Sequence, residues 1–398
     1  MRAALDLAGA LTRSIALARA GQGEAAGALL RAILSALPDQ PDALYLEGAL
    51  AGMDGRAGQA AGLIRRAVAA SPRIAAFDRL LGVACREQGK LQRLFGLYGA
   101  DLALAPAYCP MAGGARVLSG ITLCCIDTAY HDFALVALKN SMAQCQFERV
   151  LFLSDDGLRP PDVTVVPVQP LPSAEAYSRF VLKELAEHID SRFVLLAQWD
   201  GFVRDAGQWT DEFLAFDYIG ARWTCFADDH LVGNGGFSLR SQALLRATQD
   251  AEIAQLHPED FHIGRTYRPY LEQRHGIRIA DTATADRFSI EQLAMPGERA
   301  RPVSAFGFHN LFRMYEVLDS RYLGLFMDLL PASALYSNSM ALLAASYFRL
   351  GEQAEACAIA RRMLAGTPSP ESQEMLGQIL QRSGQSAGPE PVQGGGAS

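Results

Sequence analysis

Hydrophobic and polar residues follow two different patterns along this chain, and the change comes near residue 116. Before it, apolar residues recur every three to four positions, as in the stretch GEAAGALLRAILSALP that ends at Pro38. That spacing is typical of amphipathic helices. After it come short continuous apolar runs that end at acidic residues, as strands buried on both faces of a sheet do. The pattern therefore predicts a helical N-terminal part followed by an α/β domain.

The helical part contains a repeat of 34 residues, marked by three glycines and by three prolines that each come 17 positions after a glycine. These residues are Gly21, Gly55, Gly89, Pro38, Pro72 and Pro106. A 34-residue period with a glycine between two helices and a closing proline is the tetratricopeptide signature. We predict a tetratricopeptide-repeat helical array over residues 1–107. Its concave surface would bind a protein or peptide partner; the alternative is that the array only extends or dimerises the protein.

The same unit recurs near the C-terminus, where Gly351 and Pro368 are again 17 residues apart. We predict a helical segment over residues 319–384 with one tetratricopeptide-like unit. Because one repeat cannot bury its own apolar face, residues 333–384 should pack on the central domain or on the first repeats. Residues 385–398 have almost no apolar side chains and are expected to be disordered.

Between the two helical parts, apolar runs alternate with helical patterns. The predicted strands are 117–126, 149–154, 163–168 and 193–203, and helices are predicted after the first of them and at 174–189. This alternation predicts a parallel α/β sheet with right-handed crossovers, in a domain of residues 116–318. The chain has no GxGxxG turn after its first strand and no GxxxxGK[ST] loop, which argues against a dinucleotide domain and a P-loop enzyme.

Acidic residues mark the ends of two predicted strands. Asp200 interrupts the run FVLLAQWDGFV, and Asp127 follows the first strand directly. Ligands of open α/β sheets gather at the carboxyl ends of the strands, where a carboxylate suits a hard cation and a phosphate. Further along, the glycine-rich stretch around Asn234 is predicted to be a loop whose backbone can approach a ligand, or alternatively a plain turn. Glu259 and Asp260 then open a helical segment. That pair either stabilises the helix dipole or supplies a general base.

Four blocks carry a resemblance to a known class of enzymes. QWDGF, GNGGFSLRS, PEDFHIGRTYRPYLE and FGFHN occur in this order between residues 198 and 310. Together they resemble the GT-A class of glycosyltransferases and, more closely, an uncharacterised glycosyltransferase-like family, over about residues 120–315. The resemblance implies a GT-A-like domain with a Rossmann-like sheet. It also implies a hexosyltransferase-like enzyme that moves a sugar from a nucleotide-diphosphate donor to an unknown acceptor. The implied reaction is metal-assisted and inverting, with a carboxylate as the base.

The resemblance also implies roles for particular residues. Asp200 would hold Mn²⁺ or Mg²⁺ against the donor diphosphate, with His309 completing the metal shell. Asp127 would reach the nucleoside, and Glu259 or Asp260 would be the base of an inverting reaction. The residues expected along the donor are Gln198, Gly233, Asn234, Gly235 and Gly236. Gln198 departs from the usual motif, which has an aspartate in its place, and this favours an alternative: a catalytically inactive GT-A-like domain in a protein-binding scaffold.

Length, charge and cysteine content bear on the number of domains and on the kinds of site to expect. With 398 residues the chain is long enough for two or three domains, and a formal net charge of −7 argues against a nucleic-acid groove. Its seven cysteines form no CxxC pair, so a zinc site is not expected and a reducing compartment is. No apolar run is long enough to span a bilayer, and Asp6 and Arg13 interrupt the first twenty residues. We therefore expect a cytoplasmic protein without a membrane span.

Overall fold

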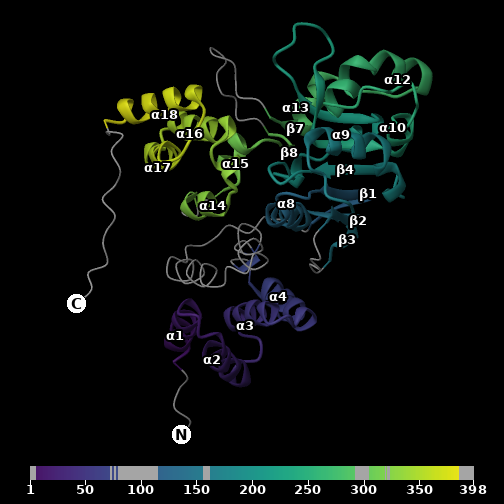
Figure 1. Ribbon diagram of the computed structural model, residues 1–398. Coiled ribbons are helices and arrows are strands. Elements are labelled where there is room, and N and C mark those ends of the chain that lie inside the picture. Colours follow the sequence, from purple (N-terminus) through teal and green to yellow (C-terminus); the bar gives the residue numbers. More distant parts are fainter. Residues whose placement is uncertain are drawn as a thin grey trace. The chain divides into compact units, whose positions relative to one another are not determined.

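The computed structural model describes residues 6–71, 74–75, 78, 115–155, 162–291, 304–318, 320 and 323–384. The chain divides into two compact units, residues 1–307 and 308–398 (Figure 1). The first unit contains the N-terminal helices and the main sheet, and the second contains helices. The third predicted repeat, around Gly89 and Pro106, and the tail at 385–398 lie outside the described residues.

The N-terminal helices form two helical hairpins. They are α1 (Leu7–Arg19), α2 (Gly23–Ala36), α3 (Pro41–Met53) and α4 (Ala57–Ala70), and each packs against the next. Gly21 and Gly55, between the helices of each hairpin, have φ angles of 76° and 75°. Residues with side chains rarely adopt this left-handed conformation, so glycine suits both turns. The helix–turn–helix pairs predicted from the 34-residue spacing are therefore present at residues 7–70.

The first unit also contains a mixed sheet of six strands. They are β1 (Arg116–Ile126), β2 (Cys145–Ser154), β3 (Thr164–Pro167), β4 (Phe193–Ala197), β5 (Tyr218–Arg222) and β6 (Val232–Ser241). The strand order is β3-β2-β1-β4-β6-β5. β1, β2, β3 and β4 are parallel, as predicted, whereas β6 is antiparallel to both β4 and β5. The prediction of an all-parallel sheet is wrong for β6, because the short segment 223–231 returns the chain directly instead of crossing over.

Helices cover both faces of the parallel half of this sheet. They are α8 (His131–Gln144), α9 (Ala174–Lys183), the 3₁₀ helix η2 (Leu185–His188) and α10 (Gln242–Ala247). Alternate residues of β1, β2 and β4 pack with Phe180, Val181, Leu185 and Leu245 in one core cluster. α8 packs against the same three strands. The connections through α8 and α9 run in opposite directions across the sheet, so right-handed crossovers place them on opposite faces.

β4 ends earlier than the sequence predicted. It stops at Ala197 instead of Val203, and Gln198 and Gly201 then pair with each other, each backbone N–H donating to the other's carbonyl at 3.0 Å. This tight turn carries Trp199 and Asp200 at its tip. The apolar run therefore contains two short elements, a buried strand and a largely buried turn at the carboxyl edge of the sheet.

Short elements complete the first unit. They are η3 (Ala206–Gln208), η4 (Asp211–Ala215), α11 (Glu259–Phe261), the π-helix η5 (His262–Thr266), α12 (Arg268–His275), α13 (Thr282–Phe288) and β7 (Ser289–Ile290); β8 (Gly307–Phe308) lies at the boundary between the units. Phe213, Phe237, Phe288 and Phe306 form an aromatic cluster with centroid distances between 5.3 and 6.5 Å. The first residue of the FGFHN block therefore belongs to the core.

The second unit is helical. Its elements are η6 (Leu311–Glu316), α14 (Leu323–Leu329), α15 (Ala332–Leu335), α16 (Asn338–Leu350), α17 (Gln353–Leu364) and α18 (Pro370–Arg382). Gly351, with φ 86°, makes the predicted turn between α16 and α17. α16 packs against η6, α17 and α18, so elements of its own unit cover much of its apolar face. η6 falls within residues 116–318, the range predicted for the central domain, yet it belongs to the second unit.

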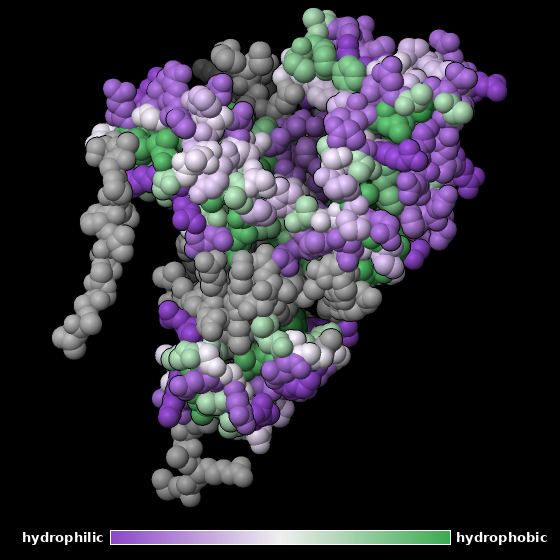
Figure 2. Space-filling view, in the orientation of Figure 1, coloured by the Kyte–Doolittle hydropathy of each residue, from purple (hydrophilic) through white to green (hydrophobic). Residues whose placement is uncertain are grey.

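The helices α12 and α18 each bury one side and present polar residues on the other. Figure 2 shows mainly hydrophilic residues over the outer sides of α12 and α18. Leu271 is the only buried residue of α12, and Leu376, Ile379 and Leu380 are buried in α18. Within the described part of the chain, no helix is long and apolar enough to cross a membrane.

Candidate functional site

The strand order reverses between β1 and β4. β1 pairs with β2 on one side, from which the chain proceeds outward to β3, and with β4 on the other. Ligands of open α/β sheets bind outside the carboxyl ends of the strands at such a reversal. Asp127 follows β1, and Asp200 lies in the turn after β4. The two acidic residues predicted to bind the donor therefore lie just beyond the carboxyl ends of β1 and β4, at the reversal of the strand order.

The charge of Asp200 acts on both Asp127 and the neighbouring Cys125. Burial raises the pKa of Asp127, and the charge of Asp200 raises it further, whereas hydrogen bonds from the backbone N–H groups of Tyr130 and Ala129 lower it. The buried thiol of Cys125 responds to both carboxylates: burial raises its pKa, and so do the charges of Asp127 and Asp200. Asp200 itself is 9% exposed. The site thus concentrates negative charge where water is scarce.

Three further side chains, those of His131, Asp155 and Trp199, follow the ends of β1, β2 and β4. His131, the first residue of α8, is 2.7 Å from Asp155 (Nε2 to Oδ1), which follows β2. Trp199 stacks on Tyr130 with ring centroids 4.7 Å apart and an angle of 14°. The charge of His131 lowers the pKa of Asp127. A sequence signal for His131 and Asp155 existed in their positions after strand ends, as for Asp127.

The glycine-rich segment is not a loop. Residues Gly233–Gly236 lie within β6, which is buried along its whole length, so the predicted loop is wrong. Because β6 is antiparallel to β4, with Ser238 opposite Leu196, its first half lies at the carboxyl edge of the parallel strands. A Cβ on Gly235 would lie 2.7 Å from both Arg240 and Glu259. The missing side chain therefore makes room for protein groups.

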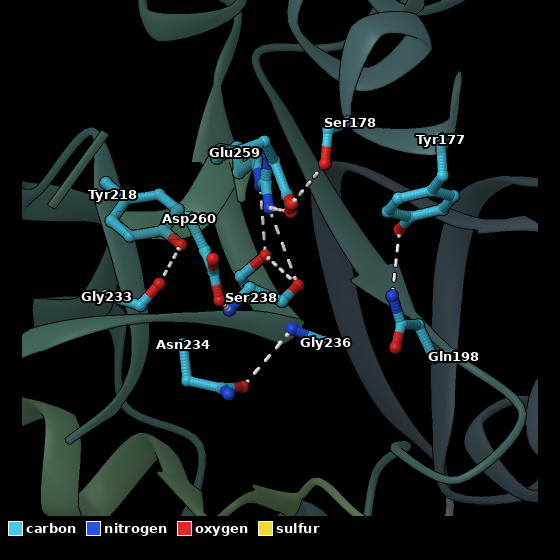
Figure 3. Close-up of polar contacts among 12 residues, drawn as sticks. Tyr177, Ser178, Gln198, Tyr218, Gly233, Asn234, Gly236, Ser238, Glu259 and Asp260 are labelled. Atoms are coloured by element: carbon cyan, nitrogen blue, oxygen red, sulfur yellow. Dashed lines mark hydrogen bonds and ion pairs between the residues drawn. The ribbon is translucent and has the colours of Figure 1, made fainter. Parts of the chain in front are cut away.

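The backbone of this segment is held by neighbouring side chains, as Figure 3 shows. The hydroxyl of Tyr218 donates to the carbonyl of Gly233 at 2.5 Å, and Ser238 donates to the carbonyl of Gly235 at 2.9 Å. The Asn234 side chain accepts the N–H of Gly236 at 3.3 Å and is 8% exposed. The segment is thus a rigid strand at the edge of the site.

Glu259 forms a buried ion pair. Its Oε1 is 3.1 Å from Nη2 of Arg240, and the two side chains are 9% and 1% exposed. Its other oxygen, Oε2, is 3.3 Å from the hydroxyl of Ser178. Both oxygens are therefore engaged by protein donors. A carboxylate in this position is poorly suited to take a proton from a substrate.

Asp260 has a different environment. Its Oδ2 accepts the N–H of Gly235 at 3.1 Å, and its Oδ1 accepts the N–H of Phe261 at 2.7 Å. Burial, followed by the charge of Glu259, raises the pKa of Asp260 to about 6. A general base works best when its pKa is close to the working pH. The structure therefore distinguishes the two residues that the sequence left as equivalent candidates.

Tyr177 connects the turn after β4 with this region. Gln198 donates from Nε2 to the Tyr177 hydroxyl at 3.0 Å (Figure 3). Burial raises the pKa of Tyr177, and the charge of Glu259 raises it further. The residue predicted to stand in a metal-ligand position thus uses its amide group in a contact with α9.

His309 comes directly after β8 and belongs to the second unit. Its role as a metal ligand together with Asp200 stays a prediction. Within the described ranges, no three His, Cys, Asp or Glu side chains form a group that could hold a metal ion. A Mg²⁺ or Mn²⁺ ion that takes most of its ligands from water and substrate phosphates needs only one or two carboxylates. The pair Asp127 and Asp200 fits that requirement.

Comparison with known proteins adds a family without an assigned activity. Residues 161–309 match the family described as "Protein of unknown function (DUF5672)". The matched segment includes the turn with Asp200, the strand β6, Glu259 and Asp260, and His309; Asp127 precedes it. No curated protein matches the chain.

Proposed function

We propose that the protein is a glycosyltransferase that transfers a sugar from a nucleotide-diphosphate donor to an acceptor hydroxyl, with inversion. One observation carries the proposal. Two acidic residues, Asp127 and Asp200, follow the adjacent strands β1 and β4 where the strand order reverses, and Asp260 is held on β6 with a pKa of about 6. The first pair suits the phosphate end of a donor, and Asp260 suits a proton transfer near neutral pH.

The reaction assigns a separate task to each group. The acceptor oxygen forms a bond to the anomeric carbon while the bond from that carbon to the diphosphate oxygen breaks. The acceptor proton passes to Asp260, whose Oδ2 is oriented by the N–H of Gly235. Proton removal by a positioned carboxylate typically contributes about 10²–10⁴-fold to the rate. Inversion requires that Asp260 approach the sugar from the side opposite the leaving diphosphate.

A divalent ion fits the proposal through the chemistry of its donors. Asp127 and Asp200 would hold it, and when bound it would offset the charge that develops on the leaving diphosphate. The protein's own contribution is to place these two carboxylates after adjacent strands, where burial, and to a smaller extent the charge of Asp200, raises the pKa of Asp127.

The architecture supports the same proposal. The mixed sheet, with four parallel strands and a reversed β6, is compatible with a GT-A-like domain. The hairpins α1–α2 and α3–α4, with glycine turns 34 residues apart, support tetratricopeptide-type repeats that recruit a protein or peptide partner.

A second candidate function is a nucleotide-independent scaffold. It is favoured by Gln198, which replaces an acidic residue and whose amide donates to Tyr177 instead of providing a carboxylate to the site. Such a scaffold would use its helical repeats for binding and need no donor.

A screen of nucleotide sugars separates the two functions. Thermal unfolding is measured with each compound and Mn²⁺, because a ligand that binds the native state raises the melting temperature by mass action. Any stabilising compound is then assayed for transfer. The enzyme proposal predicts a stabilising nucleotide sugar whose effect is reduced in Asp200→Asn and kept in Asp190→Asn. Asp190 is an exposed acid at the amino end of β4, paired with Arg149 at 3.4 Å. If no nucleotide or nucleotide sugar binds, the scaffold is correct.

A further inference from the structure

A chain of polar contacts leads from the surface to the residue beside Asp260. His257 is 2.9 Å from the hydroxyl of Ser178 through Nδ1, and Ser178 is 3.3 Å from Oε2 of Glu259. Arg240 holds the other oxygen of Glu259 at 3.1 Å. Ser178 and Arg240 are each 1% exposed, whereas the His257 side chain is 35% exposed. Figure 3 shows Ser178 and Glu259 pointing toward each other from different elements.

The donors and acceptors of this chain fix its direction. The carboxylate of Glu259 only accepts, so the single hydroxyl proton of Ser178 is donated to it. The oxygen of Ser178 then accepts the N–H of His257 at Nδ1, which requires that tautomer or the doubly protonated ring. His257 therefore orients the hydroxyl of Ser178, and Ser178 orients Glu259.

Glu259 is placed from two sides, by Arg240 of β6 and Ser178 of α9. Asp260 follows it in α11, a helix of three residues. So short a helix has little stability of its own, and side-chain contacts must set its position. A Cβ on Gly235 would lie 2.7 Å from both members of the ion pair and 3.0 Å from Asp260. These side chains therefore pack directly against the backbone of β6.

We propose that Arg240, Glu259 and Ser178 form one support that holds Asp260 against β6 in its role as base. Glu259 and Ser178 are then positioning residues, and Glu259 takes no proton from the substrate. The proposal rests on the proposed function for the role of Asp260. The charged and titratable groups that face Asp260 are Glu259, Arg240 and, from β5, Tyr218.

The test measures the pKa of Asp260 and needs no transfer activity. Unfolding is followed from pH 4 to pH 8 for each protein and for its Asp260→Asn counterpart, and the difference between the two curves reports the titration of Asp260. In Glu259→Gln the contact with Arg240 can remain while the like charge is removed, so the pKa of Asp260 should fall by about one unit or more. Ser178→Ala removes the hydroxyl that donates to Oε2 of Glu259 but keeps the charge of Glu259. If the support then loosens, the hydrogen bond from the Gly235 N–H to Asp260 weakens, so the pKa of Asp260 should rise.

Ser191→Ala is the matched control. Ser191 is buried, and its hydroxyl is 2.7 Å from the Thr122 hydroxyl and from the carbonyl of Phe193, at the amino end of β4. Its loss should lower stability without changing the pKa of Asp260, which separates positioning from a general structural effect.

Each outcome is decisive. The proposal is overturned if Glu259→Gln and Ser178→Ala leave the pKa of Asp260 as unchanged as Ser191→Ala does. If Glu259→Gln does not fold, Ser178→Ala against Ser191→Ala decides. If Ser178→Ala shifts the pKa of Asp260 as expected but no nucleotide sugar supports transfer by the native protein, the support is established and the proposed function fails alone.

Discussion

Two pairs of carboxylates lie near the carboxyl edge of the main sheet, and the protein surrounds them differently. Asp127 and Asp200 come from the ends of two neighbouring strands, and each charge disfavours the other. Glu259 and Asp260 are adjacent in sequence, yet Glu259 is paired with a buried arginine and Asp260 accepts backbone N–H groups. In the proposed function, the same chemical group would attract a cation, support a neighbour or accept a proton, according to its partners.

The largest difference should appear in stability. Glu259→Ala leaves Arg240 buried without its counter-charge, which typically costs about 3–5 kcal/mol. Removing an exposed partner instead, as in Asp190→Ala beside Arg149, should cost less than about 1 kcal/mol. Denaturant unfolding of both variants measures this, and equal losses would show that the buried pair contributes no more than a surface pair.

The second difference concerns pH. Asp260 accepts a proton only when ionised, and its pKa is about 6. Transfer should therefore be constant above pH 7 and fall about tenfold per unit below pH 6. A pH–rate profile at saturating donor tests this, and a limb that persists unchanged in Asp260→Asn would assign it to another group.

A third difference separates the crowded glycine of β6 from an open one. Gly235→Ala forces its Cβ against Arg240 and Glu259 and should cost about 1–3 kcal/mol. Gly62→Ala, in α4, meets nothing within 4 Å and should stabilise the helix by up to about 1 kcal/mol. Thermal unfolding compares the two; a neutral Gly235→Ala would mean that the support around Asp260 is loose.

The smallest expected effect concerns donor binding. Asp127→Asn and Asp200→Asn each remove one charge from the strand-end pair, and each should weaken Mn²⁺-dependent binding of the nucleotide sugar about tenfold, or about 1.4 kcal/mol. Calorimetry with and without Mn²⁺ measures it. If both variants bind the nucleotide sugar with the affinity of the native protein, this pair does not belong to the donor site.

Parts of this account could be predicted because their signals are local. The turns at Gly21 and Gly55 repeat at a fixed spacing, and the end of the first strand is visible as an apolar run that stops at Asp127. The run around Asp200 was predicted as one strand to Val203, whereas β4 ends at Ala197. Parallel order then brings such ends together. Sequence patterns alone were sufficient for the hairpins and for the position of the first carboxylate pair.

Other parts depend on partners that are distant in the sequence. The glycines around Asn234 suggested a loop because nothing nearby shows that Arg240 and Glu259 fill the space above Gly235. Glu259 and Asp260 could not be distinguished, because the residues that separate their roles include Ser178, 81 positions away. The antiparallel direction of β6 likewise depends on its pairing with β4 and β5, and the pairing of strands cannot be read from the sequence of β6 alone.

The assignment of Asp260 as the base is tested most directly by the transfer rate at pH 7.5 of Asp260→Asn compared with Glu259→Gln. The account predicts a loss of about 10²–10⁴-fold in Asp260→Asn and a loss of no more than about tenfold in Glu259→Gln. Asp190→Asn should match the native protein. A severe loss in Glu259→Gln, with Asp260→Asn still active, would contradict the account.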